Sequence, residues 1–267
     1  MSENKLYDVD RESFSKLFEA IHHFTGSHLQ REMNAIHAQW IKPFLTIPSF
    51  EHLSFAYKNQ IFCVLINIYD ESTQNFSLTV KDVDLLIKEC EKNNLVPCIF
   101  PVKINSMQYP DLKTLKVFKQ GWNLIHAVTK TPIDVFSLGT DAPIPMSQWE
   151  LHDFAIQVVR NYIKDNLKYE MLSYQNIIGI DPQIWFKDDK GNVSWIVVRH
   201  CIFPAIKPEK ELTKEYLTKL TKQSNERGKA VFQGYIAYVG FYGVWQYTGK
   251  IMRGEPTNIR FTGIEKI

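Results

Sequence analysis

The sequence has 267 residues, of which 45% are hydrophobic and 13% aromatic, and its formal net charge is +2. This apolar content suffices for one large core or two smaller ones, and it excludes a chain that is disordered throughout. The low net charge does not indicate the strongly basic surface of a non-specific nucleic-acid binder, although a local basic patch is compatible with it.

The first predicted elements are helices. Apolar residues at helical spacing predict a helix over residues 11–24, which Gly26 would end, and a second helix over 28–41. Two runs rich in β-branched and aromatic residues follow at 52–57 and 61–69. They predict a hairpin of two strands.

A further helix and further strands complete the first half. Thr79 is a suitable N-cap, and the apolar residues that follow it on one face predict a helix over 78–93. The apolar run 95–104 predicts a buried strand, and shorter apolar runs at 124–128 and 133–138 predict two more.

The turn-rich run 139–147 marks the expected boundary between two domains, residues 1–140 and residues 148–267. Beyond this boundary the order of elements begins again. The predicted elements of the second half are an amphipathic helix over 148–167, a hairpin within 179–199, a helix over 212–228 and one or two strands over 230–245.

The two halves are alike in sequence around their second helices. Leu78 and Thr79, with Val83, Leu86 and Lys88, align without gaps on Leu212 and Thr213, with Leu217, Leu220 and Lys222. The expected fold is therefore of the α/β (α+β) class, with two similar halves that each contain a mixed sheet flanked by helices. An internal duplication accounts for this similarity. The alternative is that two amphipathic helices of equal period are alike by chance.

The predicted hairpin of the second half is the stretch 179-GIDPQIWFKDDKGNVSWIVVR-199. Together with the helices around it and the strand after it, this stretch resembles the core of the PD-(D/E)xK nuclease superfamily over residues 148–240. The resemblance implies a Pro-Asp pair on the first strand of the hairpin and an acidic-x-Lys triplet on the second. It also implies a Mg²⁺ ion that two carboxylates hold and that activates the attacking water.

The residues that such a nuclease needs are replaced in this sequence. Gln183 follows Pro182 where the resemblance implies the metal-binding aspartate, Val197 stands at the acidic position and Arg199 at the lysine position. In the first half, the matching strand ends Leu65-Ile66-Asn67. An amide and a valine do not neutralise a hard cation, and an arginine stays protonated. The predicted function is therefore that of a non-catalytic interaction protein on a degenerate nuclease-like scaffold, without a cofactor.

Two alternatives stay open. In the first, Asp181 binds Mg²⁺ together with Glu150 or Asp153 from the preceding helix, and the protein is a metal-dependent nuclease; only this alternative requires Mg²⁺ as a cofactor. In the second, the protein binds nucleic acid without cleaving it. The structural interpretation of the same residues is that Asp181 starts a strand or turn before Pro182, and that Arg199 pairs with a carboxylate at the end of its strand.

Other reactive side chains form no recognisable motif. The cysteines have no CxxC spacing and are expected to be small core residues in a reducing compartment; they are Cys63, Cys90, Cys98 and Cys201. The histidines of the first helices lack the spacing of a metal site and are expected at or near the surface; they are His22, His23, His28 and His37.

The C-terminal part is rich in aromatic residues. The run 232–247 predicts a strand that is buried on both faces, or else an aromatic platform for a partner protein or an unstacked base. The tail 250–267 carries four basic residues and is expected to be a solvated terminal segment rather than a basic sheet edge.

The last expectations concern location and partners. The polar N-terminus is unlike a signal peptide, and the longest aliphatic run, 61–66, is too short to span a bilayer. The protein is therefore expected to be cytoplasmic and to make no membrane contact. The expected partner is another protein or a second copy of the chain.

Overall fold

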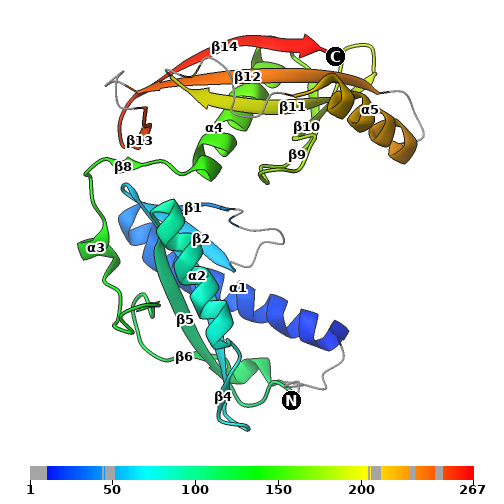
Figure 1. Ribbon diagram of the computed structural model, residues 1–267. Coiled ribbons are helices and arrows are strands. Elements are labelled where there is room, and N and C mark those ends of the chain that lie inside the picture. Colours follow the sequence, from blue (N-terminus) through cyan, green and yellow to red (C-terminus); the bar gives the residue numbers. More distant parts are fainter. Residues whose placement is uncertain are drawn as a thin grey trace. The chain divides into compact units, whose positions relative to one another are not determined.

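The computed structural model describes residues 11–43, 45, 52–203, 205, 212–228, 232–243 and 249–267. The chain divides into two compact units, Met1–Ala142 and Pro143–Ile267, which are described one after the other (Figure 1). The division falls within the turn-rich run 139–147.

The first unit is a mixed sheet flanked by two helices. Its elements are α1 (Arg11–Ile36), β1 (Gln39–Trp40), β2 (Leu53–Tyr57), β3 (Gln60–Asp70), β4 (Asn75–Phe76), α2 (Val80–Asn93), β5 (Val96–Ile104), η1 (Leu112–Thr114), β6 (Lys116–Val117), β7 (Ile125–His126) and α3 (Val135–Leu138). The strand order is β1-β2-β3-β5-β6, with β4 on β3 and β7 on β5. Strands β3 and β5 are parallel, and α2 makes the crossover between them.

The second unit has the same kind of architecture. Its elements are β8 (Ile144–Pro145), α4 (Gln148–Asn161), a π-helical turn η2 (Tyr162–Asn166), β9 (Glu170–Tyr174), β10 (Ile184–Lys187), β11 (Val193–Ile202), α5 (Lys214–Gly228), β12 (Gln233–Gly243), β13 (Met252–Arg253) and β14 (Thr257–Lys266). The strand order of its main sheet is β14-β12-β11-β10-β9. Strands β11 and β12 are parallel across α5, and their neighbours are antiparallel.

The two units share one order of elements: a helix, three antiparallel strands, a crossover helix and a parallel strand. They also share a hydrogen bond. The Ile66 N–H on β3 donates to Nδ1 of His52 over 2.7 Å, and the Val198 N–H on β11 donates to Oε1 of Gln183 over 2.8 Å. This shared bond makes Gln183 equivalent to His52, and Arg199 equivalent to Asn67. The structure thus confirms the α+β class; a common origin of the units stays a prediction.

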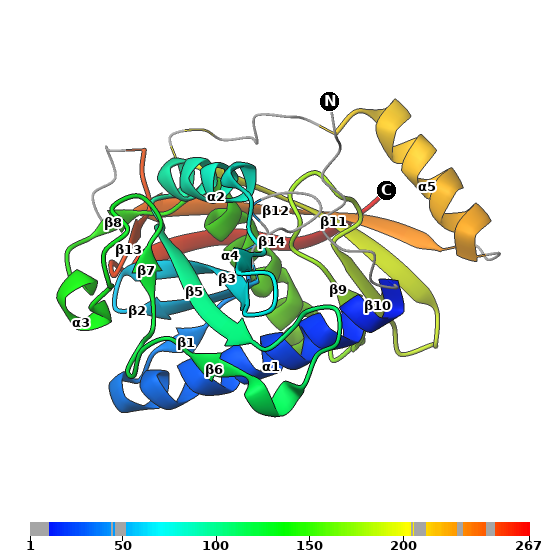
Figure 2. The same ribbon diagram turned by 90° about the horizontal axis from the view of Figure 1, so that it is seen from below.

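Each sheet is covered by a helix on either face, because its apolar residues alternate between the faces. In the first unit, α1 packs against residues such as Phe62 and Val64, and α2 packs against Cys63 and Leu65. In the second unit, α4 covers one face with a buried stripe; its partners on the sheet include Ile196, Val198, Ala237, Val239 and Phe241. On the other face, Leu220 of α5 packs on Trp195 and Val197. Figure 2 shows the same elements from below.

Polar caps fix where the helices of both units begin. Thr79 is the N-cap of α2, as the sequence predicts, and forms a capping box with Asp82; Ser147 and Glu150 form another at α4. In the second unit, the hydroxyl of Thr213 accepts the Tyr216 N–H. This bond caps the first turn of α5.

Three expectations about local structure are wrong. Helix α1 continues through Gly26, because Leu29 and Met33 prolong the buried stripe of the first turns. The run 133–138 is not a strand: Asp134 accepts the Phe136 N–H and starts the short helix α3. The tail forms β14, a full edge strand paired with β12. Of the predicted strand over 230–245, the part 233–243 is β12, and its ends lie outside the described residues.

Candidate functional site

The site that the sequence singles out centres on an ion pair in the second unit. Asp181 precedes β10, and Arg199 lies on the neighbouring strand β11. The guanidinium donates from Nη1 to Oδ1 over 2.9 Å and from Nη2 to Oδ2 over 2.5 Å. Only 3% of the Asp181 side chain and 22% of the Arg199 side chain are exposed. This paired, two-point contact is the stronger kind of charge-assisted hydrogen bond.

Two further side chains complete the set of donors around Asp181. The Tyr216 hydroxyl, which α5 supplies, donates to Oδ2 over 2.5 Å, and Nε2 of Gln183 donates to Oδ1 over 2.5 Å. Gln183 also accepts the Val198 N–H, so its amide is fixed at both ends. Each carboxylate oxygen therefore accepts two hydrogen bonds from the protein itself.

The electrostatics of the cluster follow from burial and pairing. Burial by itself raises the pKa of Asp181, but the hydrogen bonds from Arg199 and Tyr216 outweigh it, and the pKa lies below its usual value. Burial likewise lowers the pKa of Arg199, but the bond to Asp181 outweighs it and raises that pKa. Burial and then the bond to Asp181 raise the pKa of Tyr216 to about 12. The cluster is thus a neutralised pair with a protonated tyrosine.

The two helix carboxylates that were candidates to join Asp181 are engaged elsewhere. Glu150 lies at the start of α4 and accepts two hydrogen bonds from Arg253, at 2.6 Å and 2.9 Å, while it caps its own helix. Asp153 accepts hydrogen bonds from Asn176 over 2.6 Å and from Gln157 over 2.5 Å. The structure therefore brings together Asp181 and Arg199, but not Glu150 or Asp153.

The chemistry available at this cluster follows from its donors. A divalent cation binds carboxylate oxygens that are free to coordinate it, and a second carboxylate usually completes the site. Here the Arg199 guanidinium, and not a second carboxylate, lies against Asp181. Gln183 and Val197 supply no charge. Within the described ranges, no three histidine, cysteine, aspartate or glutamate side chains are grouped so that they could hold a metal ion.

Sequence reasoning missed two histidines close to this cluster. His152 on α4 and His200 on β11 have ring centroids 5.9 Å apart, and each pKa is lowered to about 4. Burial is the main cause of both shifts. The charge of His200 further lowers the pKa of His152, and the charge of Arg199 further lowers the pKa of His200. Both imidazoles are therefore neutral at neutral pH. The sequence offers no signal for them, since each is a single histidine within an apolar run.

The His152 pKa predicts how stability changes with pH. The folded pKa of about 4 lies below the ordinary 6.5, so the unfolded chain takes up the proton first. The contribution of His152 to the free energy of unfolding is constant above pH 6.5. It falls as the pH drops from 6.5 towards 4, and below pH 4 it is constant again. Between pH 7 and pH 5 this group lowers the free energy of unfolding by about 1–2 kcal/mol.

Urea denaturation at the two pH values measures this slope for the wild type and for His152→Gln. We expect the variant to lose less stability on acidification. An equal loss in both proteins would show that His152 does not titrate in this window.

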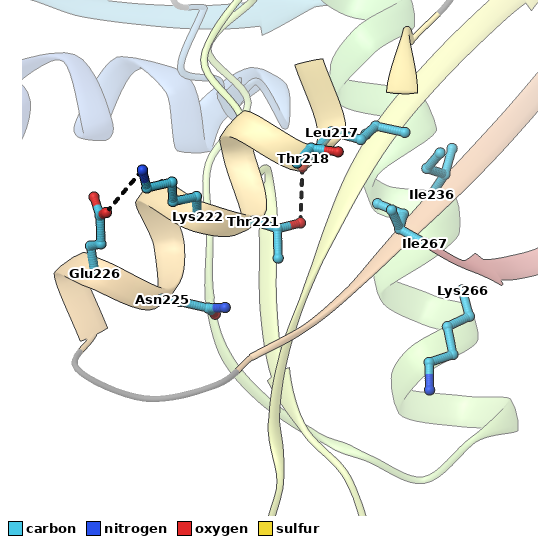
Figure 3. Close-up of a pocket in the computed structure, with 9 residues that line it drawn as sticks. All are labelled: Leu217, Thr218, Thr221, Lys222, Asn225, Glu226, Ile236, Lys266 and Ile267. Atoms are coloured by element: carbon cyan, nitrogen blue, oxygen red, sulfur yellow. Dashed lines mark hydrogen bonds and ion pairs between the residues drawn. The ribbon is translucent and has the colours of Figure 1, made fainter. Parts of the chain in front are cut away.

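An open groove lies beside α5 in the second unit and has a volume of about 810 Å³. Figure 3 shows Leu217 and Thr221 of α5 on one side and Ile236 and Ile267 on the other. Three charged residues also line the groove: Lys222, Glu226 and Lys266. Lys222 and Glu226 lie 3.9 Å apart and form an ion pair.

The first unit has a groove of about 640 Å³ at the equivalent place. Its lining includes Val83 and Ile87 of α2 and Ile99 of β5. In the gapless alignment Val83 matches Leu217, and Ile99 pairs with β3 as Ile236 pairs with β11. Both crossover helices therefore leave part of the sheet beside them accessible.

The remaining sequence candidates take structural places. Cys63, Cys90 and Cys98 are buried and Cys201 is half-buried, and all four are free thiols. The expectation that His28 lies at or near the surface is wrong, because His28 is buried and its Nε2 lies 2.6 Å from the Gly121 carbonyl oxygen. Among the helices of the described ranges, none is both long and apolar enough to cross a membrane.

Comparisons with known proteins concern the second unit. Comparison with curated proteins and with solved structures finds no match. Residues 149–267, which span α4 to the end of β14, match a family described as "Domain of unknown function (DUF8840)". The second unit is thus similar to that family, whose description names no activity.

Proposed function

We propose that the protein is a non-catalytic interaction protein built on a PD-(D/E)xK-like scaffold, and that it acts in the cytoplasm. Its partner is another protein or a second copy of the chain. Fold alone says little about function, so the proposal depends on the residues of the site.

The observation that carries the proposal is the saturation of Asp181. Its two oxygens accept hydrogen bonds from Arg199, Tyr216 and Gln183, and the pair with Arg199 is already neutral. A metal ion would have to displace a buried guanidinium, which would then lack a counter-charge. The order of elements in each unit supports a nuclease-like scaffold, and Gln183, Val197 and Arg199 do not supply the metal ligands that the resemblance implies.

Apolar grooves on the surface of each unit support the proposed interaction role. Each unit has an apolar groove beside its crossover helix, and exposed apolar patches commonly mark sites of protein association. In the first unit, Val80 and Val128 line this groove and are largely exposed. Apolar grooves of this kind suit the apolar side of a partner segment.

Calorimetric titration with Mg²⁺ and then Mn²⁺ tests the proposal. We expect heats of dilution alone for the wild type and for Asp181→Ala, because the carboxylate has no coordination site to offer. Asp189→Ala, in the exposed turn of the hairpin, is the matched control for the loss of one carboxylate. Saturable binding that Asp181→Ala abolishes and Asp189→Ala keeps would support the nuclease alternative instead.

A further inference from the structure

Part of the sheet face that α5 covers in the second unit is open where the sequence predicts burial. On β12, the side chains that face α4 are fully buried: Ala237, Val239 and Phe241. On the opposite side, 36% of Tyr238 is exposed, and Gly240 and Tyr242 are half-buried. The expectation that this strand is buried on both faces is therefore wrong.

Residues from three strands gather on this side, which we call the open face: Phe203, Tyr238, Gly240, Tyr242 and Arg260. Phe203 follows β11, and its N–H donates to the Phe241 carbonyl over 2.9 Å. Arg260 on β14 pairs in register with Gly240 and is exposed. Helix α5 packs on Trp195, near the other end of β11 (Figure 1). The open face thus lies at the end of the sheet away from that contact.

The aromatic rings of the open face are arranged for stacking. Phe203 is 37% exposed, and its ring stacks on Tyr242 with centroids 5.3 Å apart at an angle of 25°. Tyr238 stands four residues before Tyr242 on the same side of β12, which corresponds to about 13 Å along a strand. Gly240 lies between them, and a Cβ on this glycine would lie 3.6 Å from the Tyr242 ring and 3.6 Å from Cβ of Arg260. The Tyr242 ring and the Arg260 stem therefore lie beside Gly240, and Tyr238 is a second aromatic position farther along the strand.

The second unit as a whole carries an excess of positive charge. The second unit contains 17 Lys and Arg residues against 13 Asp and Glu, whereas the first contains 14 against 16. Arg260 adds an exposed cation to the open face itself, whereas Arg199, which lies across from Tyr238 on β11, is already paired with Asp181. A partner that is both anionic and rich in planar groups complements these residues.

We propose that the open face binds single-stranded nucleic acid. The bases stack on Tyr238 and on the Phe203–Tyr242 pair, while Arg260 lies near the phosphates. The inference rests on the proposed function in one respect, that the bound strand is not cut. An acidic peptide would satisfy the charge but not the rings, since base stacking needs aromatic planes and not apolar area alone.

Fluorescence anisotropy with a labelled oligothymidylate of about 15 nucleotides tests this proposal on the full chain. We expect saturable binding that weakens as salt rises, and weaker binding of a duplex of equal length. Tyr238→Leu and Phe203→Leu should each weaken binding about 5- to 50-fold, because they keep apolar area and lose the ring. Tyr238→Phe should bind like the wild type. Arg260→Gln should weaken binding and flatten the salt dependence.

Tyr109→Leu, which removes an exposed ring from the first unit, is the matched control and should bind like the wild type. Circular dichroism of each variant separates lost binding from lost folding. Absence of binding at low salt would overturn the inference, as would equal affinity of the wild type and the Tyr238→Leu and Phe203→Leu variants. Displacement of the oligonucleotide by polyglutamate beyond the effect of salt would also overturn it and favour an acidic peptide.

The failure of this inference and that of the proposed function are distinguishable. After incubation with Mg²⁺, the oligonucleotide is run on a denaturing gel. An intact but bound strand supports both. A cut strand overturns the non-catalytic function while the binding surface stands, and an intact strand without binding overturns the open face alone.

Discussion

Replacement of Glu150 with alanine lowers the free energy of unfolding by about 3–5 kcal/mol. The Glu150 and Arg253 side chains are 7% and 8% exposed, so the variant removes a buried carboxylate that accepts two hydrogen bonds from the Arg253 guanidinium. It also removes the carboxylate that accepts the Ser147 N–H over 2.8 Å and caps α4. Urea denaturation followed by circular dichroism measures the loss.

The matched control is Glu226→Ala on α5. Glu226 is exposed and lies 3.9 Å from Lys222 in an i, i+4 pair, and such surface pairs contribute less than about 1 kcal/mol. Glu150→Gln should lose less stability than Glu150→Ala, since the amide oxygen still caps the helix. Equal stability of Glu150→Ala and Glu226→Ala would show that the Arg253 contact does not hold the second unit together.

Replacement of Asp181 with alanine lowers the free energy of unfolding by about 2–4 kcal/mol. The loss is expected to be smaller than at Glu150, because Arg199 is 22% exposed and regains part of its hydration. The variant also removes the acceptor for the Tyr216 hydroxyl, which joins the first turn of α5 to the hairpin. The same denaturation experiment measures the change.

The double variant Asp181→Ala with Arg199→Met distinguishes the cause of this loss. If the uncompensated guanidinium is responsible, removing it together with its partner restores part of the stability. A double variant less stable than Asp181→Ala alone would contradict this explanation. Asp189→Ala, in the exposed turn, is expected to change stability by less than about 0.5 kcal/mol.

Much of the fold can be predicted from periodicity and caps. Thr79 begins α2 because its hydroxyl and the Asp82 carboxylate satisfy the first free N–H groups, and these two residues are visible in the sequence. Gly26 misled the prediction, because a glycine ends a helix only where the buried stripe also stops. The strand β14 could not be predicted, because its sequence is largely polar and its position in the sheet comes from pairing with β12, a contact that the local sequence does not reveal.

The candidate site, like the fold, could be predicted from the sequence only in part. Local sequence alone places Gln183, Val197 and Arg199 at the positions where the nuclease resemblance implies metal-site residues. The contact of Tyr216 with Asp181 could not be, because 35 residues separate the two and only the docking of α5 brings them together. Likewise, Glu150 and Arg253 are 103 residues apart and meet through the fold.

A plasmid-nicking assay of the wild-type protein with Mg²⁺, and separately with Mn²⁺, tests most directly the proposal that the protein is non-catalytic. The saturated Asp181 cluster predicts that supercoiled DNA stays intact at every protein concentration. Nicking that appears with metal, disappears with chelator and is abolished by Asp181→Ala would contradict the account.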